Sequence, residues 1–396
     1  MRKVFSVLLV AIVLMLNPIA YSSFYASAET ENETTSIEVE IEKSVEDQLS
    51  SLDTLALEEL FKSISNTKEI FVSEDFNQTI KNVITGKINV NTTSFFNYSA
   101  RLFLDDVIRY LPYVCLILAM AVLYSMVSST SVGNKSIGDM VHFVCFGAIV
   151  VICVSCITHL VGITTECVAS VKSQMDVVFP ILLTLVTALG GNVSVSMFQP
   201  SMVALSNLAI TIFSNILLPL FTFKIIFTII SNITNGIKFN KFSEFFGSCF
   251  KWLLGAIITI FTAFMSVSGL MSGFVDGISL KTAKYTIKSG IPIIGGFLSD
   301  GVSVMMLSCS LIKNAIGVSG LVLLFCSIII PVIKIVVFSL LLKLVSAILE
   351  PIADSRVTSF VGDIAKSIST LIAIILGVAF MYFIVVGLVM CIVNFG

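Results

Sequence analysis

The 396-residue chain is 56% apolar, only 12% charged and carries a formal net charge of -2. Fourteen of its 25 carboxylates lie between Glu29 and Asp75, so the remainder is nearly charge-free, as the interior of a bilayer requires. No basic tract with interleaved aromatic residues occurs, so nothing indicates a nucleic-acid-binding protein. The composition predicts an all-α, polytopic membrane protein.

Residues 1–28 have the pattern of a secretory signal peptide. Two basic residues precede an apolar stretch from Val4 to Leu16, and small residues lead up to Ala28. This order predicts export, with cleavage between Ala28 and Glu29. The alternative is an uncleaved anchor helix that runs to about Tyr25.

Residues 29–107 form an acidic region, predicted to be extracytoplasmic. Its beginning is poor in aromatic residues, which predicts disorder. One amphipathic helix follows, with apolar residues at helical spacing: Leu49, Leu52, Leu57, Leu60 and Phe61. The region is too small to bury much core alone, so we expect it to pack on the membrane domain or on a partner.

Residues 108–396 read as a domain of seven to nine spans. A span needs about 20 apolar residues, and such runs lie near residues 110–128, 137–162, 177–197, 201–218, 219–235, 252–275, 315–332, 333–349 and 368–393. As single helices, 201–235 and 315–349 would each be roughly 50 Å long. A break or tight hairpin is therefore expected near Pro219 and near Pro331.

The sequence leaves the sidedness of two basic loops open. If the acidic region lies outside and 201–235 is split into two spans, the loop of Lys238 lies in the cytoplasm, as the positive-inside rule prefers. The same number of spans then places the lysines after 280 outside, against the rule. Either 201–235 is one tilted helix, or the region 276–314 is re-entrant and lies at an interface.

Small residues recur every four positions before this region, at Gly269, Gly273 and Gly277. Such a ridge lets helix backbones approach closely in lipid. We expect it to pack helices within or between subunits, and we expect a homo-oligomer.

The segment 276–314 is predicted to be interrupted. Lys281, Lys284 and Lys288 share one face of an amphipathic helix, and glycines and a proline break the apolar run between 290 and 296. Broken helices at membrane depth are tolerated only where they are buried in protein or line water. The segment is thus either a re-entrant or pore-lining element or a solvated loop between spans. The candidate interface or pore-lining residues are Asp276, Lys281, Lys284, Lys288, Asp300 and Lys313.

Several lysines interrupt apolar sequence. A charge at mid-bilayer costs roughly 2.5 to 3.5 kcal/mol on insertion scales, so such residues usually face protein, water or headgroups. Lys343 lies near the end of its run and is expected to snorkel. Lys224 and Lys334 each follow a proline and are the candidates for an internal role.

Enzyme motifs are weak, and we expect no catalytic site, cofactor or metal. Cys153 and Cys156, with His159 nearby, lie in a helix-length apolar run without the further ligands that zinc needs. Gly317 to Gly320 matches the G-x-S-G of intramembrane proteases around Ser319, but the chain's two histidines carry no accompanying pattern.

Three segments resemble the stage III sporulation protein AE family of endospore-forming bacteria. They are DGISLKTAKYTIKSGIPIIGGFLSD (276–300), SLIKNAIGVSG (310–320) and LLKLVSAILEPIAD (341–354), and the likeness extends over roughly 179–369. The signal peptide, the small acidic head and the multi-span domain also fit this family.

The resemblance implies a subunit of the channel-like, secretion-like complex that connects the mother cell with the forespore. It also implies partnership with other stage III sporulation A operon proteins, among them a cytoplasmic secretion-type ATPase, and with stage II sporulation protein Q. It places the chain in the mother-cell-derived membrane around the forespore, with its head in the intermembrane space. The alternatives are a self-sufficient secondary transporter for a small solute and, third, an intramembrane protease.

Overall fold

The computed structural model describes residues 58–59, 92–130, 135–233, 239–290, 295–353 and 355–392. The predicted signal peptide and its cleavage site lie outside this part of the chain. The regular elements within it are all helical: α6 (Thr92–Thr130), α7 (Lys135–Ala188), α8 (Asn192–Ile212), the π-helical turn η1 (Phe213–Leu217), α9 (Leu218–Ile233), α10 (Asn240–Gly290), α11 (Gly295–Leu349) and α12 (Ser355–Cys391). The all-α fold class is confirmed.

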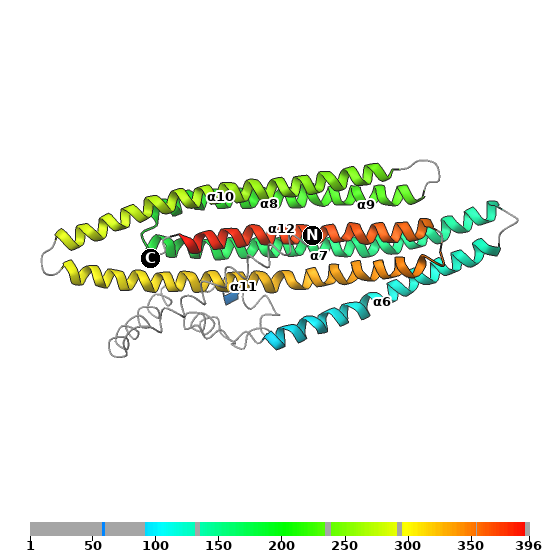
Figure 1. The fold of residues 1–396 in the computed structure, drawn as a ribbon, viewed down its shortest axis with the longest axis horizontal. Helices are drawn as coiled ribbons and strands as arrows, with labels where there is room; N and C mark the ends of the chain where they lie inside the picture. Colours follow the sequence, from blue (N-terminus) through cyan, green and yellow to red (C-terminus); the bar gives the residue numbers. More distant parts are fainter. Residues whose placement is uncertain are drawn as a thin grey trace.

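The helices form an elongated bundle in which they lie side by side along one direction (Figure 1). The α6–α7 pair extends past its neighbours at one end, and the α10–α11 pair extends past them at the other. Hydrocarbon offers no hydrogen-bond partners to a backbone, so apolar segments of this length form helices that bond internally.

The helix α12 forms the centre of the bundle. It packs against α11, α7, α9 and α10, fully buries Phe360 and Tyr382, and leaves no residue exposed from Ser367 to Met390. A helix that is apolar all round is expected to be buried in this way. The outer helices instead present large apolar side chains outward, such as Leu116, Trp252 and Ile260, which suits contact with lipid.

Six helices of the described residues are long and apolar enough to cross a membrane, against the seven to nine spans predicted from sequence. The chain is an integral membrane protein. The expected hairpin near Pro331 is wrong, because α11 continues through this proline. No hairpin lies near Pro219 either, since η1 joins α8 to α9 directly before it. Bundle neighbours and local π-helical adjustment make prolines tolerable within membrane helices.

The packing defines which segments share an end of the bundle. The rings of Tyr110 and Phe338 lie 5.0 Å apart, and Ser125 Oγ donates to the Ile352 carbonyl at 2.6 Å, so α6 and α11 run in the same direction. The start of α6 therefore points to the end that holds the α10–α11 turn. The α9–α10 turn lies at the opposite end (Figure 1).

Candidate functional site

A sharp reversal of the chain between α7 and α8 builds the first part of the site. Gly190 has a φ of 84°, a left-handed conformation that glycine adopts without strain. Its N–H donates to the Thr187 carbonyl at 2.8 Å, and the Gly191 N–H donates to the Val186 carbonyl at 2.9 Å. This pair of bonds is the Schellman ending of a helix. It allows α8 to begin after only three residues that follow the end of α7.

The start of α8 is completed by a side chain from another helix. Its N-cap, Gly191, provides no side-chain hydrogen bond. Asp276 on α10 instead accepts two hydrogen bonds from the start of α8. Its Oδ1 accepts from the Val193 N–H at 3.1 Å, and its Oδ2 accepts from the Ser194 N–H at 2.8 Å. The first N–H groups of a helix lack internal partners and carry partial positive charge. Asp276 is only 1% exposed, and these two hydrogen bonds give each of its carboxylate oxygens a partner.

The end of α12 shows the opposite arrangement. Lys313 on α11 is fully buried, and its Nζ donates to the backbone carbonyl of Ile392, directly after α12. The last carbonyls of a helix carry partial negative charge, which a cation stabilises. Asp276 and Lys313 thus hold α10 and α11 at the level where α8 begins and α12 ends. Beyond that level, α10 and α11 continue as a projecting pair (Figure 1).

The remaining candidate pore-lining residues belong to this projecting pair. Residues 276–290 continue α10 and residues 295–314 begin α11, while 291–294 lie outside the described part of the chain. Lys281 is exposed. The side chains of Lys284, Lys288 and Asp300 are outside the description, so their role stays a prediction.

The structure places the predicted glycine ridge on α10. A Cβ at Gly269 would lie 3.2 Å from Phe198 Cζ and 3.5 Å from Leu388 Cδ2, so the ridge packs closely there within the subunit. A Cβ at Gly277 would meet nothing within 4 Å. The surroundings of Gly273 are outside the description, and oligomerisation through the ridge stays a prediction.

The G-x-S-G segment lies where α11 meets α12 and α7. A Cβ at Gly317 would lie 2.6 Å from Met390 Sδ, and one at Gly320 would lie 2.9 Å from Tyr382 Oη and 3.1 Å from Val178 Cγ1. Ser319 is buried, and its Oγ donates to the Ala315 carbonyl one turn earlier on the same helix at 2.8 Å. These contacts favour helix packing as the role of the motif.

Replacing Gly320 with alanine is expected to lower the free energy of unfolding by about 1 to 3 kcal/mol through overpacking. The added methyl cannot be accommodated easily, because Tyr382 is fully buried and stacks on Phe179 at 5.5 Å. Thermal unfolding of the detergent-solubilised protein measures the effect. The matched control is Gly255→Ala, where a Cβ meets nothing within 4 Å. Equal melting temperatures for the two variants would contradict the prediction.

Lys224 is held between α9, α10 and α12. Its Nζ donates to Thr370 Oγ1 at 3.3 Å. A Cβ at Gly247 would lie 3.4 Å from Lys224 Cε, so this glycine leaves room for the lysine stem. The contacts bring Lys224 inward, as its position in apolar sequence predicts, although an internal functional role stays a prediction.

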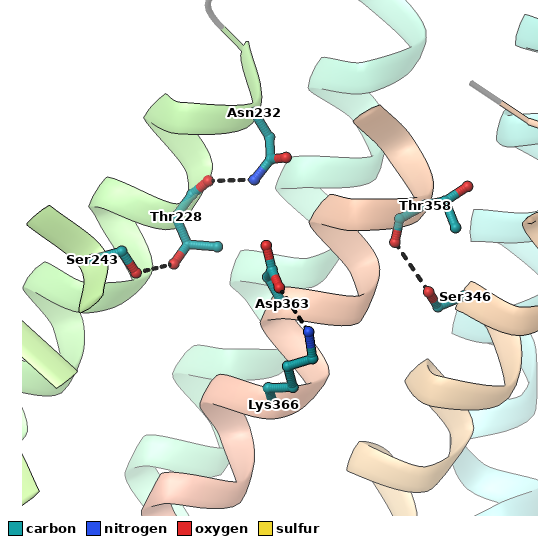
Figure 2. Close-up of polar contacts among 7 residues, drawn as sticks. All are labelled: Thr228, Asn232, Ser243, Ser346, Thr358, Asp363 and Lys366. Atoms are coloured by element: carbon teal, nitrogen blue, oxygen red, sulfur yellow. Dashed lines mark hydrogen bonds and ion pairs between the residues drawn. The ribbon is translucent and has the colours of Figure 1, made fainter. Parts of the chain in front are cut away.

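Several polar contacts lie at the end of the bundle that holds the α9–α10 and α11–α12 turns (Figure 2). Thr228 Oγ1 and Ser243 Oγ lie 2.7 Å apart and join α9 to α10, while Ser346 Oγ donates to the Thr358 carbonyl at 3.0 Å and joins α11 to α12. Lys366 and Asp363 form an ion pair at 3.2 Å on α12. That pair is largely exposed, so it adds little stability.

Sequence reasoning missed two carboxylates. Asp106 is only 6% exposed, and its helix α6 packs against α11, which carries Lys334. Asp176 lines a cavity of about 570 Å³ between α7 and α8, whose other walls are mostly apolar. Asp106 and Asp176 lie just before the predicted spans 110–128 and 177–197, where a carboxylate is expected in a solvated loop. The burial of Asp106 depends on the packing of α6 against the other helices, which the local sequence does not show.

The cysteine pair that resembled a metal motif is buried on α7, with Cys153 unexposed and Cys156 5% exposed. His159 is exposed. Among the residues that the structure describes, no three His, Cys, Asp or Glu side chains gather in a way that could hold a metal ion.

Long apolar helices whose buried charges pair with the ends of neighbouring helices define a polytopic α-helical membrane protein. The chain matches the family described as stage III sporulation protein AE over residues 74–393, and it belongs to that family. It is similar to the stage III sporulation protein AE of Bacillus subtilis (strain 168), with 26% identity over 250 residues, which are 63% of each chain. The match thus covers less than two thirds of this relative. No solved structure matches the chain.

Proposed function

We propose that the chain is a non-enzymatic membrane subunit of the sporulation channel complex that connects the mother cell with the forespore. The observation that carries the proposal is the extent of the family match, which covers nearly the whole helical bundle. The family name ties the chain to the third stage of sporulation, and the bundle provides a membrane-embedded scaffold for such a complex.

The proposed partners are other proteins of the stage III sporulation A operon, including a cytoplasmic secretion-type ATPase, and stage II sporulation protein Q. The ATPase would supply energy to the complex. The proposed location is the mother-cell-derived membrane around the forespore, with the acidic region in the intermembrane space. Export by the signal sequence and the six spanning helices of the described residues would then place the start of α6 and the end of α12 on the side of that space.

The geometry refines the expected role of the segment 276–314. Asp276 and Lys313 are both engaged with helix ends, so we assign them to positioning the α10–α11 pair. The part of the pair beyond them, with the exposed Lys281, is the candidate for lining or gating a path. The proposed homo-oligomer would bring several such pairs together.

Deleting the gene is expected to block spore formation and late gene expression in the forespore, because the channel would lose its membrane scaffold. Heat-resistant spore counts and a late forespore reporter measure this outcome. Complementation by the intact gene and by a Ser319→Ala variant should both restore sporulation, since the Ser319 hydroxyl bonds to the Ala315 carbonyl of its own helix. Normal sporulation of the deletion strain would contradict the proposal. Failure of Ser319→Ala, despite normal protein levels, would point to the intramembrane protease instead. Ion-coupled solute uptake by the protein alone in liposomes would favour the transporter.

A further inference from the structure

The projecting part of α10 presents a surface that is both basic and apolar. After Asp276 the helix continues to Gly290, about 20 Å at 1.5 Å per residue. Ile278, Lys281 and Tyr285 are spaced three and four residues apart on one face. Ile278 is 68% exposed and Tyr285 is 74% exposed, and Lys281 is exposed between them. We call these three residues the hairpin face.

The position of the hairpin face is unusual for a basic segment. It lies at the end of the bundle from which α6 starts, and the region that the signal pattern predicts to be exported precedes α6. Lysines of short loops prefer the cytoplasmic side of a membrane. The loop with Lys238 and Lys241 satisfies this preference at the opposite end, whereas Lys281 and the two lysines that follow it do not. A nearby group of negative charge would stabilise these lysines on that side of the membrane.

The chain itself carries that charge on the same side. The segment Glu29–Asp75 holds 14 carboxylates against three lysines. It also contains the amphipathic pattern that includes Leu52, Leu57 and Leu60. An acidic segment with an apolar stripe complements a basic face with an exposed isoleucine, in both charge and apolar character.

The connecting chain is long enough for the contact. The register of Tyr110 against Phe338 places the start of α6 beside about residue 320 of α11, and the antiparallel α10–α11 pair places Lys281 beside about residue 304. The separation along the bundle is therefore about 24 Å. Residues 76–91 connect Asp75 to Thr92, and 16 residues can extend to about 50 Å.

We propose that the acidic segment Glu29–Asp75 docks on the hairpin face of the same chain. The contact neutralises the lysines on the exported side and covers Ile278. Tethering by the short connection raises the effective concentration of the segment near the face, so weak individual contacts suffice. This inference does not depend on the proposed membership of the channel complex, because it concerns one chain in its membrane.

Photo-crosslinking in the full-length protein tests the contact. The photoreactive residue p-benzoylphenylalanine replaces the exposed Thr282, beside Lys281, in protein reconstituted into bilayers with anionic lipid. Mass spectrometry is expected to find the crosslink within residues 29–75 of the same chain. The control carries the probe at Trp252, which is 76% exposed on the same helix but far from the face, and should give no such product. Crosslinks to lipid only, or a dimer band on a denaturing gel, would overturn the proposal.

Charge reversal separates this contact from chance proximity. The double variant Lys281→Glu with Lys284→Glu is expected to reduce the crosslink about tenfold, and 0.5 M salt should weaken it in the unmodified protein. Changing Glu38, Glu40 and Glu42 to lysine in the double variant should restore it. The matched control, Lys241→Glu with Lys251→Glu, reverses two exposed lysines on the rest of α10 and should leave the crosslink unchanged. An undiminished crosslink in the first double variant would refute the docking.

Discussion

Replacing Asp276 with alanine is expected to lower the free energy of unfolding by about 2 to 4 kcal/mol. A helix-end N–H that loses its side-chain acceptor costs about 0.5 to 2 kcal/mol, so two such donors cost about 1 to 4 kcal/mol, and burial places the loss in the upper part of this range. Asp276 serves two N–H groups at the start of α8, at 3.1 and 2.8 Å, and the N-cap residue Gly191 provides no side-chain substitute. The alanine variant therefore leaves both N–H groups without a side-chain acceptor. Such groups are costly where no water can replace the lost partner.

Thermal unfolding of the purified protein in detergent, followed by circular dichroism, measures this loss. Asp276→Asn keeps one oxygen acceptor without the charge, so about half of the effect should remain. Asp105→Ala removes an exposed carboxylate on α6 and should change stability by less than about 0.5 kcal/mol. If Asp276→Ala melts at the same temperature as Asp105→Ala, the capping role is wrong.

Reversing the charge of Lys313 is expected to have the largest effect of any substitution considered. Lys313→Glu would bury a carboxylate against the carbonyl end of α12, where the partial charge is also negative. An uncompensated buried charge costs several kcal/mol. We expect the variant to be degraded and nearly absent from the membrane.

The matched Lys313→Met should accumulate close to normal levels, with a loss of about 1 kcal/mol. Methionine fills the space of the lysine stem, and removing the charge relieves the cost of burying it. Immunoblots of membrane fractions compare the variants, together with Lys343→Glu as a control at an exposed lysine on the same helix. A stable Lys313→Glu protein would show that Ile392 is not the partner that matters.

The contrast between two lysines shows how far local sequence reaches. Lys224 stood out because a charge inside an apolar run is costly, and it does turn inward to Thr370, 146 residues away in the chain. Lys334 stood out for the same reason, but Asp106, a buried carboxylate on the helix α6 that packs against α11, did not. A charge can be recognised from its immediate neighbours in sequence, whereas its partner depends on which helices pack together.

The prolines show where local reasoning failed. Pro331 predicted a break on the ground that it removes a backbone hydrogen bond, yet α11 runs through it for 55 residues. The segment around Pro219 is also continuous, with a π-helical turn directly before it. Bundle neighbours stabilise these helices beyond their intrinsic preference, so both segments are continuous where the sequence predicted a break.

The sequence by itself determined that this protein resides in lipid and is built from helices. Apolar length and scarce charge suffice for that conclusion, because a backbone in hydrocarbon must satisfy its own hydrogen bonds. The segment 276–314 was also marked as special by its glycines and lysines. Only the tertiary structure decided what Asp276 and Lys313 do. Each pairs with the end of a helix about 80 residues away in the chain, and such pairing depends on where α8 begins and α12 ends beside α10 and α11.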